Sequence, residues 1–299
     1  MKLLVTGSRG QVAQSLAERA MGRPALDLTF VARPDFDLAD PDSIRRTLRD
    51  AAPDVVVSAA AYTAVDRAED DPDLARRINA VAPGVLAETC AGIGARLVHL
   101  STDYVFDGTG TAAHDETAPT GPQTVYGRTK LEGEEAVRAA LPHHHVIVRT
   151  AWVYSPFGAN FVRTMLRLAG ERDELSVVSD QVGNPTCALD IADGLLAMIG
   201  SWQDGRSIGL GQTFHLAGTG EASWFDLASH VVATSGRLGG PAARVRPIPS
   251  EAYPQRAHRP RNSRLDSGRF EAAFRYRSPD WRAASERVVG RLLEAASPQ

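Results

Sequence analysis

The sequence predicts an α/β protein whose first half forms a doubly wound parallel sheet. Short apolar runs rich in β-branched residues alternate with segments of helical periodicity, which is typical of parallel strands joined by helices. These runs carry almost no charge, as expected when helices cover both faces of a sheet. A glycine-containing turn directly follows the first run and opens the first helical segment. These three observations define the fold class.

The elements follow from the same patterns. The predicted strands of the first half are residues 2–6, 26–31, 54–59, 96–100 and 146–149. Helices are predicted over residues 11–20, 42–51, 74–91, 126–140 and 160–170. After about residue 150 the alternation loosens, and Gly and Pro become frequent. There the patterns predict a strand over 214–217 and helices over 190–199, 224–234 and 284–295.

Composition excludes several classes of protein. The chain is 43% hydrophobic and 23% charged, with a formal net charge of −3, which gives no electrostatic footprint for nucleic acid. No apolar run is long enough to cross a bilayer, and the first apolar run is too short for a signal peptide. Two cysteines, Cys90 and Cys187, do not make a disulfide framework. We therefore expect a cytoplasmic protein with no membrane or nucleic-acid partner. Without further spaced ligands, His143, His144 and His145 are expected in a solvated loop, so no metal site is predicted.

The turn after the first predicted strand has the pattern Gly7-x-x-Gly10-x-x-Ala13. Glycine lets the backbone approach a pyrophosphate, and the free N–H groups of a helix N-terminus attract it. The turn therefore predicts a dinucleotide site in a Rossmann-type sheet. We accordingly expect a dinucleotide-binding domain over residues 1–150 and a smaller, interleaved C-terminal substrate domain over residues 151–299. Segments near 160–172 and 210–220 are expected to return to the first domain.

Two further segments bear on the cofactor. The second predicted strand leads into Arg33, which favours the 2′-phosphate of NADPH, but Asp35 and Asp37 follow and leave NADH open. After the third strand come the small residues 58–61, against which a flat cofactor can lie. Helix–sheet packing is the alternative explanation of these small residues.

Only two of the 33 basic residues are lysines, Lys2 and Lys130. Where charge alone is needed this chain uses arginine, so position 130 is expected to need a compact ammonium. Tyr126 lies four residues earlier, and this spacing places both side chains on one face of a helix. Ser101 and Thr102 follow the fourth strand at the same edge of the sheet. A hydroxyl, a phenol and an ammonium suit carbonyl reduction, with the ammonium lowering the phenol pKa and Thr102 polarising the carbonyl.

With the glycine turn, the segment Ser101–Gly108 and the Tyr-x-x-x-Lys pair, the chain resembles the extended short-chain dehydrogenases/reductases. More narrowly, it resembles the dTDP-4-dehydrorhamnose reductase family over nearly its whole length. The segments more specific to that family are 149–154, 180–186 and 259–265. The resemblance implies NAD(P)H-dependent reduction of the 4-keto group of dTDP-4-dehydro-β-L-rhamnose, a step in making dTDP-rhamnose for cell-surface polysaccharide.

The resemblance also implies individual roles. Tyr126 donates the proton, Lys130 holds the nicotinamide ribose, and Thr102 orients the keto oxygen. Asp103 and Tyr104 lie at the sugar, and Trp152 walls it by stacking, unless Trp152 is only a core residue. Some arginines of 256–264 face the diphosphate, unless they form a solvated turn. The remaining cofactor contacts fall on Gly7, Gly10, Gln11, Val12, Arg33, Asp37, Leu38, Ala61, Tyr62 and Thr63.

One departure from the family concerns assembly. Some bacterial members pair through Mg²⁺ bridged by carboxylates, but the corresponding positions here are Ser15 and Leu189. We therefore expect a monomer or a metal-independent homodimer. Two rival functions stay open: another nucleotide-sugar 4-ketoreductase or epimerase, and a non-catalytic NADP-binding subunit like the regulatory subunit of methionine adenosyltransferase.

Overall fold

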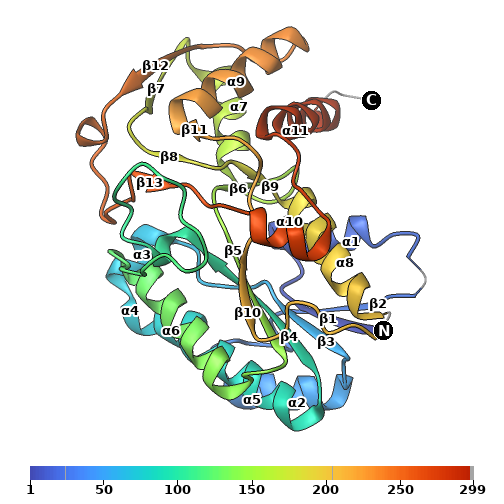
Figure 1. Ribbon diagram of the computed structural model, residues 1–299. Helices are drawn as coiled ribbons and strands as arrows, with labels where there is room; N and C mark the ends of the chain where they lie inside the picture. Colours follow the sequence, from blue (N-terminus) through green and yellow to red (C-terminus); the bar gives the residue numbers. More distant parts are fainter. Residues whose placement is uncertain (24, 204, 297–299) are drawn as a thin grey trace.

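A sheet of six parallel strands organises the chain, in the order β10–β5–β4–β3–β1–β2 (Figure 1). The computed structural model describes all residues except 24, 204 and 297–299. The six strands are β1 (Lys2–Thr6), β2 (Asp27–Val31), β3 (Val55–Ser58), β4 (Arg96–Thr102), β5 (His145–Thr150) and β10 (Gln212–His215). The α/β class with a parallel central sheet, predicted from the sequence, is confirmed.

The strand order reverses next to β1. The chain runs from β1 outward to β2 and then crosses back to β3 on the other side of β1. Ligands of open α/β sheets bind at the carboxyl ends of the strands at such a reversal. The turn after β1 and the loop after β3 meet at this edge, so the topology positions the dinucleotide site there.

One face of the sheet is covered by α2 (Pro41–Ala51), α5 (Ala82–Ile93) and α6 (Val125–Ala140). Alternate strand residues such as Leu4, Val56 and Leu97 pack against them and are almost completely buried. Because successive strand side chains point to opposite faces, the intervening residues form a second core on the other side.

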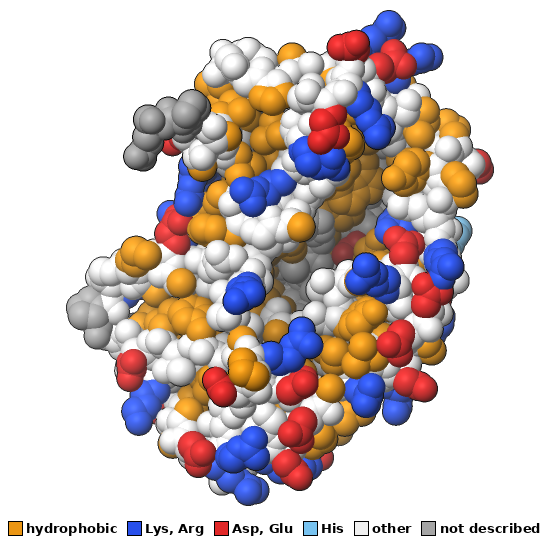
Figure 2. All heavy atoms as spheres, turned by 180° about the vertical axis from the view of Figure 1, so that it is seen from behind, with side chains coloured by type: hydrophobic (Ala, Val, Ile, Leu, Met, Phe, Trp, Pro, Cys, Tyr) orange, Lys and Arg blue, Asp and Glu red, His pale blue; other side chains and the backbone are white. Residues whose placement is uncertain are grey.

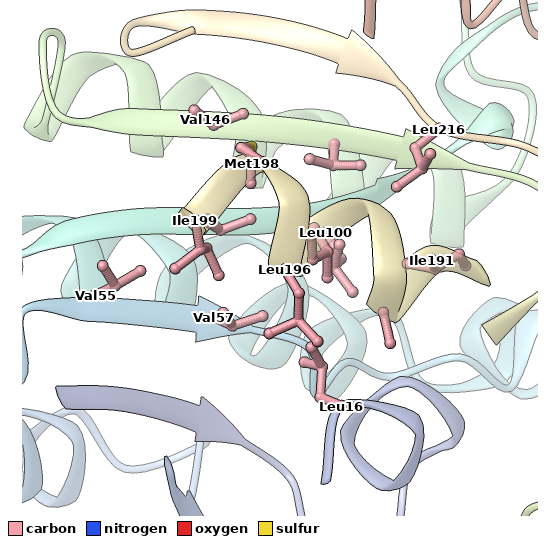
Figure 3. Close-up of a cluster of buried hydrophobic side chains, with 14 of the residues drawn as sticks. Leu16, Val55, Val57, Leu100, Val146, Ile191, Leu196, Met198, Ile199 and Leu216 are labelled. Atoms are coloured by element: carbon pink, nitrogen blue, oxygen red, sulfur yellow. The ribbon is translucent and has the colours of Figure 1, made fainter. Parts of the chain in front are cut away.

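That second core is covered by α1 (Gln11–Arg19), α8 (Ala188–Gln203) and α10 (Gly268–Phe274). Figure 3 shows Leu196 and Ile199 of α8 near Val57 and Val55 of β3, and all four belong to one buried cluster. Helix α8 is apolar nearly all round, as expected for a helix buried between two layers. The second half of the chain thus completes the sheet of the first.

A smaller unit lies above the carboxyl edge of the sheet (Figure 1). Its core joins α7 (Phe161–Glu171), α9 (Trp224–Arg237) and α11 (Trp281–Ala296) with the strand pair β7 (Glu174–Val178) and β12 (Arg244–Ile248). Short strands line its junction with the main sheet: β6 (Val153–Tyr154), β8 (Val182–Gly183), β9 (Thr186–Cys187), β11 (Ala222–Ser223) and β13 (Asn262–Ser263).

Of the two segments expected to return to the first domain, one does so and the other does not. The segment near 210–220 contains β10, which pairs with β5 at the edge of the six-stranded sheet. The segment near 160–172 is α7, and it does not return, because Val162, Met165 and Leu166 pack in the core of the smaller unit. Helices α8 and α10 return instead, which the sequence patterns did not indicate.

Several boundaries also differ. The helix expected over 74–91 is divided into α4 (Pro72–Arg76), a π-helical turn η1 (Arg77–Val81) and α5. Pro83 cannot donate to the carbonyl of Asn79, which accounts for the irregular turn. His145 does not lie in a solvated loop as expected. It is buried at the start of β5, and its Nδ1 lies 2.6 Å from the Leu141 carbonyl.

The remaining short elements are α3 (Val65–Asp70) and the 3₁₀ turns η2 (Asp103–Val105) and η3 (Ser250–Ala252). Across the described residues, none of the helices combines the length and apolarity that a bilayer crossing requires.

Candidate active site

Two adjoining cavities follow the carboxyl edge of the sheet, with volumes of about 610 and 410 Å³. Gly7, Arg9, Gly10, Ala60 and Ala61 line both cavities, so the two form one groove. Figure 2 shows the molecule hollowed between its two parts. Every residue that the sequence assigned to the cofactor lines this groove: Gly7, Gly10, Gln11, Val12, Arg33, Asp37, Leu38, Ala61, Tyr62, Thr63, Tyr126 and Lys130.

The glycine turn has the geometry that a pyrophosphate needs. Gly7 has φ +87°, which side chains rarely adopt, and a Cβ there would lie 3.3 Å from Ala60 Cβ. Gly10 is the N-cap of α1, and no side chain caps this helix end. The first N–H groups of a helix have no partner within it, and Gly10, Gln11, Val12 and Ala13 line the groove, so this free helix end lies at the groove. The residues therefore fit a dinucleotide.

Two arginine side chains contribute to this groove. Arg33, just after β2, lines the larger cavity together with Arg9, which sequence reasoning missed. Both side chains are exposed. The Asp37 carboxylate accepts a hydrogen bond from the Ala39 backbone N–H at 2.9 Å, so part of its acceptor capacity serves the turn. This cavity therefore carries Arg9, Arg33 and Asp37, whereas Asp35 is not among its lining residues.

The loop after β3 is held by two buried polar side chains. Thr6 Oγ1 accepts from the N–H groups of Ala59 and Ala60, at 3.1 and 3.0 Å. Asn79, fully buried in η1, accepts from Tyr62 N at 2.8 Å and donates to Tyr62 O at 3.1 Å. These contacts fix the floor of the groove. Asn79 was not predicted, because nothing local marks its position.

Tyr126, near the start of α6, lies at the inner end of the groove. Burial raises the pKa of Tyr126 to about 12, opposed by a hydrogen bond with the Thr102 side chain and reinforced by the charge of Asp103. The sequence reasoning expected the neighbouring ammonium to lower this pKa. In the structure desolvation outweighs any such effect, and the phenol stays protonated at neutral pH.

Lys130 is buried one helical turn further along α6, as the spacing predicts. Its Nζ donates to the carbonyl of Leu100 at 2.7 Å and lies 3.3 Å from Nε2 of His99. Burial lowers the pKa of Lys130 to about 8, against the attraction of Glu134. The ammonium is therefore anchored to β4, and its side chain still lines the groove.

Below Lys130 lies a buried charged cluster that sequence reasoning also missed. Glu134 accepts from Arg149 at 2.9 and 2.7 Å, from Arg138 at 2.7 Å and from Ser101 at 2.6 Å. Glu134 is fully buried and the Arg149 side chain is 4% exposed. The cluster ties α6 to β4 and β5 beneath Tyr126 and Lys130.

Thr102 and Asp103 end β4 beside Tyr126. Thr102 Oγ1 donates to Asp103 Oδ1 at 3.0 Å and accepts from Tyr104 N at 3.2 Å. Burial raises the pKa of Asp103 to about 6, although hydrogen bonds from Ser263 and Thr102 oppose the rise. The Tyr104 ring meets the Tyr126 ring edge-on, with centroids 5.5 Å apart. The predicted hydroxyl, carboxyl and phenol groups are therefore brought together.

Trp152 lies where the chain leaves β5 for the smaller unit. Its backbone has φ +48°, and its indole stacks on Trp224 with centroids 3.6 Å apart and planes inclined by 6°. A Cβ on Gly183 would lie 2.8 Å from this indole. One face of Trp152 is thus covered by a second tryptophan, which the sequence did not indicate.

Trp224 lines a third cavity of about 470 Å³, together with Tyr253, Gln181 and Arg259. A fourth cavity of about 370 Å³ shares these last three residues and follows the loop 250–261. Both lie on the side of the smaller unit. They share no lining residue with the dinucleotide groove, and they provide separate space for a ligand in the smaller unit.

The arginines of 256–264 are all paired in the structure. Arg259 holds Asp66 of α3 through two hydrogen bonds of 3.2 and 2.7 Å. The other pairs are Arg256 with Asp70, Arg261 with Glu251 and Arg264 with Glu221. Among these arginines, Arg259 lines both the third and the fourth cavity. Arg256 and Arg261 stay largely exposed, with 66% of each side chain accessible, whereas Arg259 and Arg264 are mostly covered, at 20% and 16%.

Ser15 and Leu189 are both buried, with 0% and 3% of their surface exposed. Neither supplies a carboxylate. Throughout the described parts of the chain, no group of three or more His, Cys, Asp or Glu side chains is arranged to hold a metal ion.

A dinucleotide groove over a parallel sheet, with a Tyr-x-x-x-Lys pair at its inner end, defines a protein of the short-chain dehydrogenase/reductase class. Residues 1–294 match the family described as the RmlD substrate binding domain, and the chain belongs to this family. A dTDP-4-dehydrorhamnose reductase from Sinorhizobium fredii is 46% identical, with 98% of each chain covered.

Solved structures agree with this assignment. The crystal structure of a dTDP-4-dehydrorhamnose reductase from Clostridium acetobutylicum superimposes with a TM-score of 0.89 at 35% identity, covering 98% of this chain and 100% of the other. A dTDP-4-dehydrorhamnose reductase from Bacillus anthracis in complex with NADP gives a TM-score of 0.87 at 32% identity, covering 96% and 98%.

Proposed function

We propose that this chain reduces the 4-keto group of dTDP-4-dehydro-β-L-rhamnose, with NADPH as the donor, and so forms dTDP-β-L-rhamnose for cell-surface polysaccharide. One observation carries the proposal: Tyr126, Thr102 and Lys130 converge at the inner end of a groove fitted for a dinucleotide. The relative named for this reaction, 46% identical over nearly the whole chain, supports the same substrate.

NADPH, when bound, supplies the hydride. Tyr126 then protonates the developing alkoxide, because its raised pKa of about 12 keeps the proton on the phenol until negative charge appears beside it. The Thr102 hydroxyl, hydrogen-bonded with Tyr126, orients the keto oxygen against the phenol. Lys130 holds the nicotinamide ribose with an ammonium that β4 already fixes in place.

The two parts of the chain divide the work. We assign cofactor binding to residues 1–150 together with β10, and substrate binding mainly to the later residues of the smaller unit. Arg33 and Arg9 favour NADPH because both line the adenosine end, where a 2′-phosphate would lie. NADH remains a usable donor in this proposal, since the 2′-phosphate lies away from the end of the groove that holds Tyr126 and Lys130.

Substrate binding is assigned to the cavities beside the groove. Arg259 is the best placed arginine for the diphosphate, since it lines both cavities and is already oriented by Asp66. Asp103 and Tyr104 stand beside Tyr126, where the sugar must present its keto group. Trp152, backed by Trp224, closes the sugar end with a broad apolar wall.

The experiment is to mix the protein with NADPH and dTDP-4-dehydrorhamnose and follow the absorbance of the reduced cofactor. We expect turnover, and we expect Tyr126→Phe to lose about 10²–10⁴-fold in kcat while NADPH affinity is kept. Turnover only with a different dTDP or UDP 4-keto sugar would favour another ketoreductase or epimerase. Binding of NADPH without any turnover would favour a regulatory subunit.

The compartment and the assembly belong to the same proposal. Free Cys90 and Cys187, both buried, suit a reducing cytoplasm. We infer that the protein acts as a monomer or as a homodimer held without a bridging metal, because Ser15 and Leu189 offer no carboxylate.

A further inference from the structure

His99 lies in the middle of β4, directly against the buried amine of Lys130. It is 1% exposed, and its Nε2 is 3.3 Å from Lys130 Nζ. On the opposite side of the ring, Nδ1 is 3.2 Å from Oγ of Ser58 at the end of β3. The imidazole therefore joins two strands to the helix that carries Tyr126 and Lys130.

The chemistry of these contacts fixes the protonation of the ring. An ammonium has three donors and no acceptor, so Nε2 of His99 must be the acceptor and Nδ1 must carry the proton. The Nδ1–H then donates to Ser58 Oγ. Burial and the charge of Lys130 hold the pKa of His99 well below its ordinary value, which agrees with a neutral ring.

The contact with His99 leaves one N–H group of the Lys130 ammonium for the cofactor. One N–H of Lys130 goes to the Leu100 carbonyl at 2.7 Å and a second to His99 Nε2. The third remains, on a side chain that lines the groove where the nicotinamide ribose would lie. Two fixed acceptors thus aim the last N–H at the ribose.

The charged and titratable groups around the pair come from α6 and β5. Glu134 attracts the Lys130 ammonium, whereas Arg138 and His145 act on His99 in the same direction as Lys130. Glu134 is itself neutralised by Arg149. His99 is therefore the direct acceptor on this side of the ammonium, and it acts through a hydrogen bond rather than through charge.

We propose that His99 is a positioning residue for the reduction, a neutral acceptor that holds the Lys130 ammonium charged and directed at the nicotinamide ribose. The inference rests on the proposed function, since it deepens the role of Lys130 in that reaction. It also explains the rare lysine at position 130, because a guanidinium could not donate to two such close acceptors and still direct a single N–H into the groove.

Two amide substitutions at His99 distinguish the loss of the acceptor for Lys130 from the loss of the imidazole ring itself. In His99→Gln the side-chain oxygen reaches the place of Nε2, so Lys130 keeps its acceptor. In His99→Asn the amide reaches only the place of Nδ1, so the contact with Ser58 stays and the acceptor for Lys130 is lost. Both variants are polar and neutral, which makes each the control of the other.

The charge of Lys130 can be followed by NMR, because the chain has only two lysines. Labelling the chain with lysine carrying ¹³C at Cε gives two signals, one from Lys130 and one from exposed Lys2, which serves as the internal reference. The pH titration of the Lys130 signal reports its charge without substrate or cofactor. We expect a midpoint near pH 8 in the wild type and in His99→Gln. In His99→Asn we expect it to fall by about one pH unit, because a hydrogen bond to a charged group is lost.

Activity should follow the same order. Lys130 is needed as the ammonium, so kcat/KM falls as pH rises through its pKa, and the basic limb in His99→Asn should move down by about the same one unit. An unchanged Lys130 midpoint in His99→Asn would overturn the proposal, and so would an equal fall in both variants. If His99→Asn does not fold, Ser58→Ala replaces it. Loss of the Nδ1–H partner should lower the midpoint in the same direction, and no change would again overturn the proposal.

The two proposals fail separately. Absence of turnover by the wild type on dTDP-4-dehydrorhamnose would refute the proposed function and leave the titration to judge the contact between His99 and Lys130. Turnover by the wild type with identical titrations in all variants would refute the role of His99 alone.

Discussion

Replacing Glu134 by glutamine should destabilise the protein more than its single lost charge suggests. The Glu134 side chain is fully buried, and its two oxygens accept four hydrogen bonds, from Arg149, Arg138 and Ser101. Arg149 is buried as well, with its side chain 4% exposed. Glutamine keeps the shape but leaves the Arg149 guanidinium charged, buried and without its counter-ion.

The magnitude follows from that uncompensated charge. Breaking a buried ion pair by removing one partner costs about 3–5 kcal/mol. In a chain of 299 residues, this corresponds to a fall in Tm of about 5–8 °C. Burial alone would raise the pKa of Glu134, but hydrogen bonds and charge from Arg149, with Ser101 and Arg138, lower it overall.

The lowered pKa of Glu134 determines how the loss of stability in Glu134→Gln depends on pH. A carboxyl whose pKa is lower in the folded state stabilises the fold above its unfolded value, about 4.3, and loses that contribution as pH falls through the folded value. The difference in Tm between wild type and Glu134→Gln should therefore be largest at neutral pH and shrink below about pH 4.

Thermal unfolding followed by circular dichroism measures the difference. Glu135→Gln is the matched control, because Glu135 is the next residue of α6 and is exposed. It should melt within about 1 °C of the wild type, as surface substitutions usually do. If Glu134→Gln melted with this control at neutral pH, the account of the buried cluster would be wrong.

Three further predictions concern catalysis, the cofactor and assembly. Lys130→Arg should be nearly as damaging to kcat/KM as Lys130→Ala, because the larger planar group cannot use the acceptors on β4 that hold the ammonium. Arg33→Ala should lower kcat/KM for NADPH by roughly 10–100-fold and leave that for NADH nearly unchanged, since a charged hydrogen bond to the 2′-phosphate is lost. Adding Mg²⁺ or EDTA should change neither the mass measured by light scattering nor the reductase rate, because Ser15 and Leu189 cannot offset the dehydration of Mg²⁺.

Each of these predictions has a contradicting result. Substantial activity in Lys130→Arg would show that charge alone is needed at this position. For the cofactor, Arg49→Ala is the control, an exposed arginine of α2 outside the groove, and an equal loss with NADPH and NADH in Arg33→Ala would remove the 2′-phosphate from the explanation. A shift from dimer to monomer on chelation would mean that the metal ligands were placed at the wrong positions.

Local patterns were enough for the first half of the fold and for the residues that line the groove at its carboxyl edge. Strands β1, β3 and β4 are short apolar runs, and a glycine turn between a strand and a helix leaves few alternatives. The i,i+4 spacing of Tyr126 and Lys130 on α6 fixes their common face. These features depend on residues close in sequence, so the sequence determines them without knowledge of the packing.

The tertiary structure alone decided what depends on residues far apart in the chain. The return of residues near 210–220 to the first domain was expected, but the partner strand of β10 was not. The position of α8 over the sheet and the contact of His99 with Lys130 also leave no periodic signal in the sequence. The rise in the Tyr126 pKa also depends on the tertiary structure, because it follows from the desolvation of the phenol. Spacing therefore placed Tyr126 and Lys130 on one face of α6, whereas burial and long-range contacts determined their protonation and orientation.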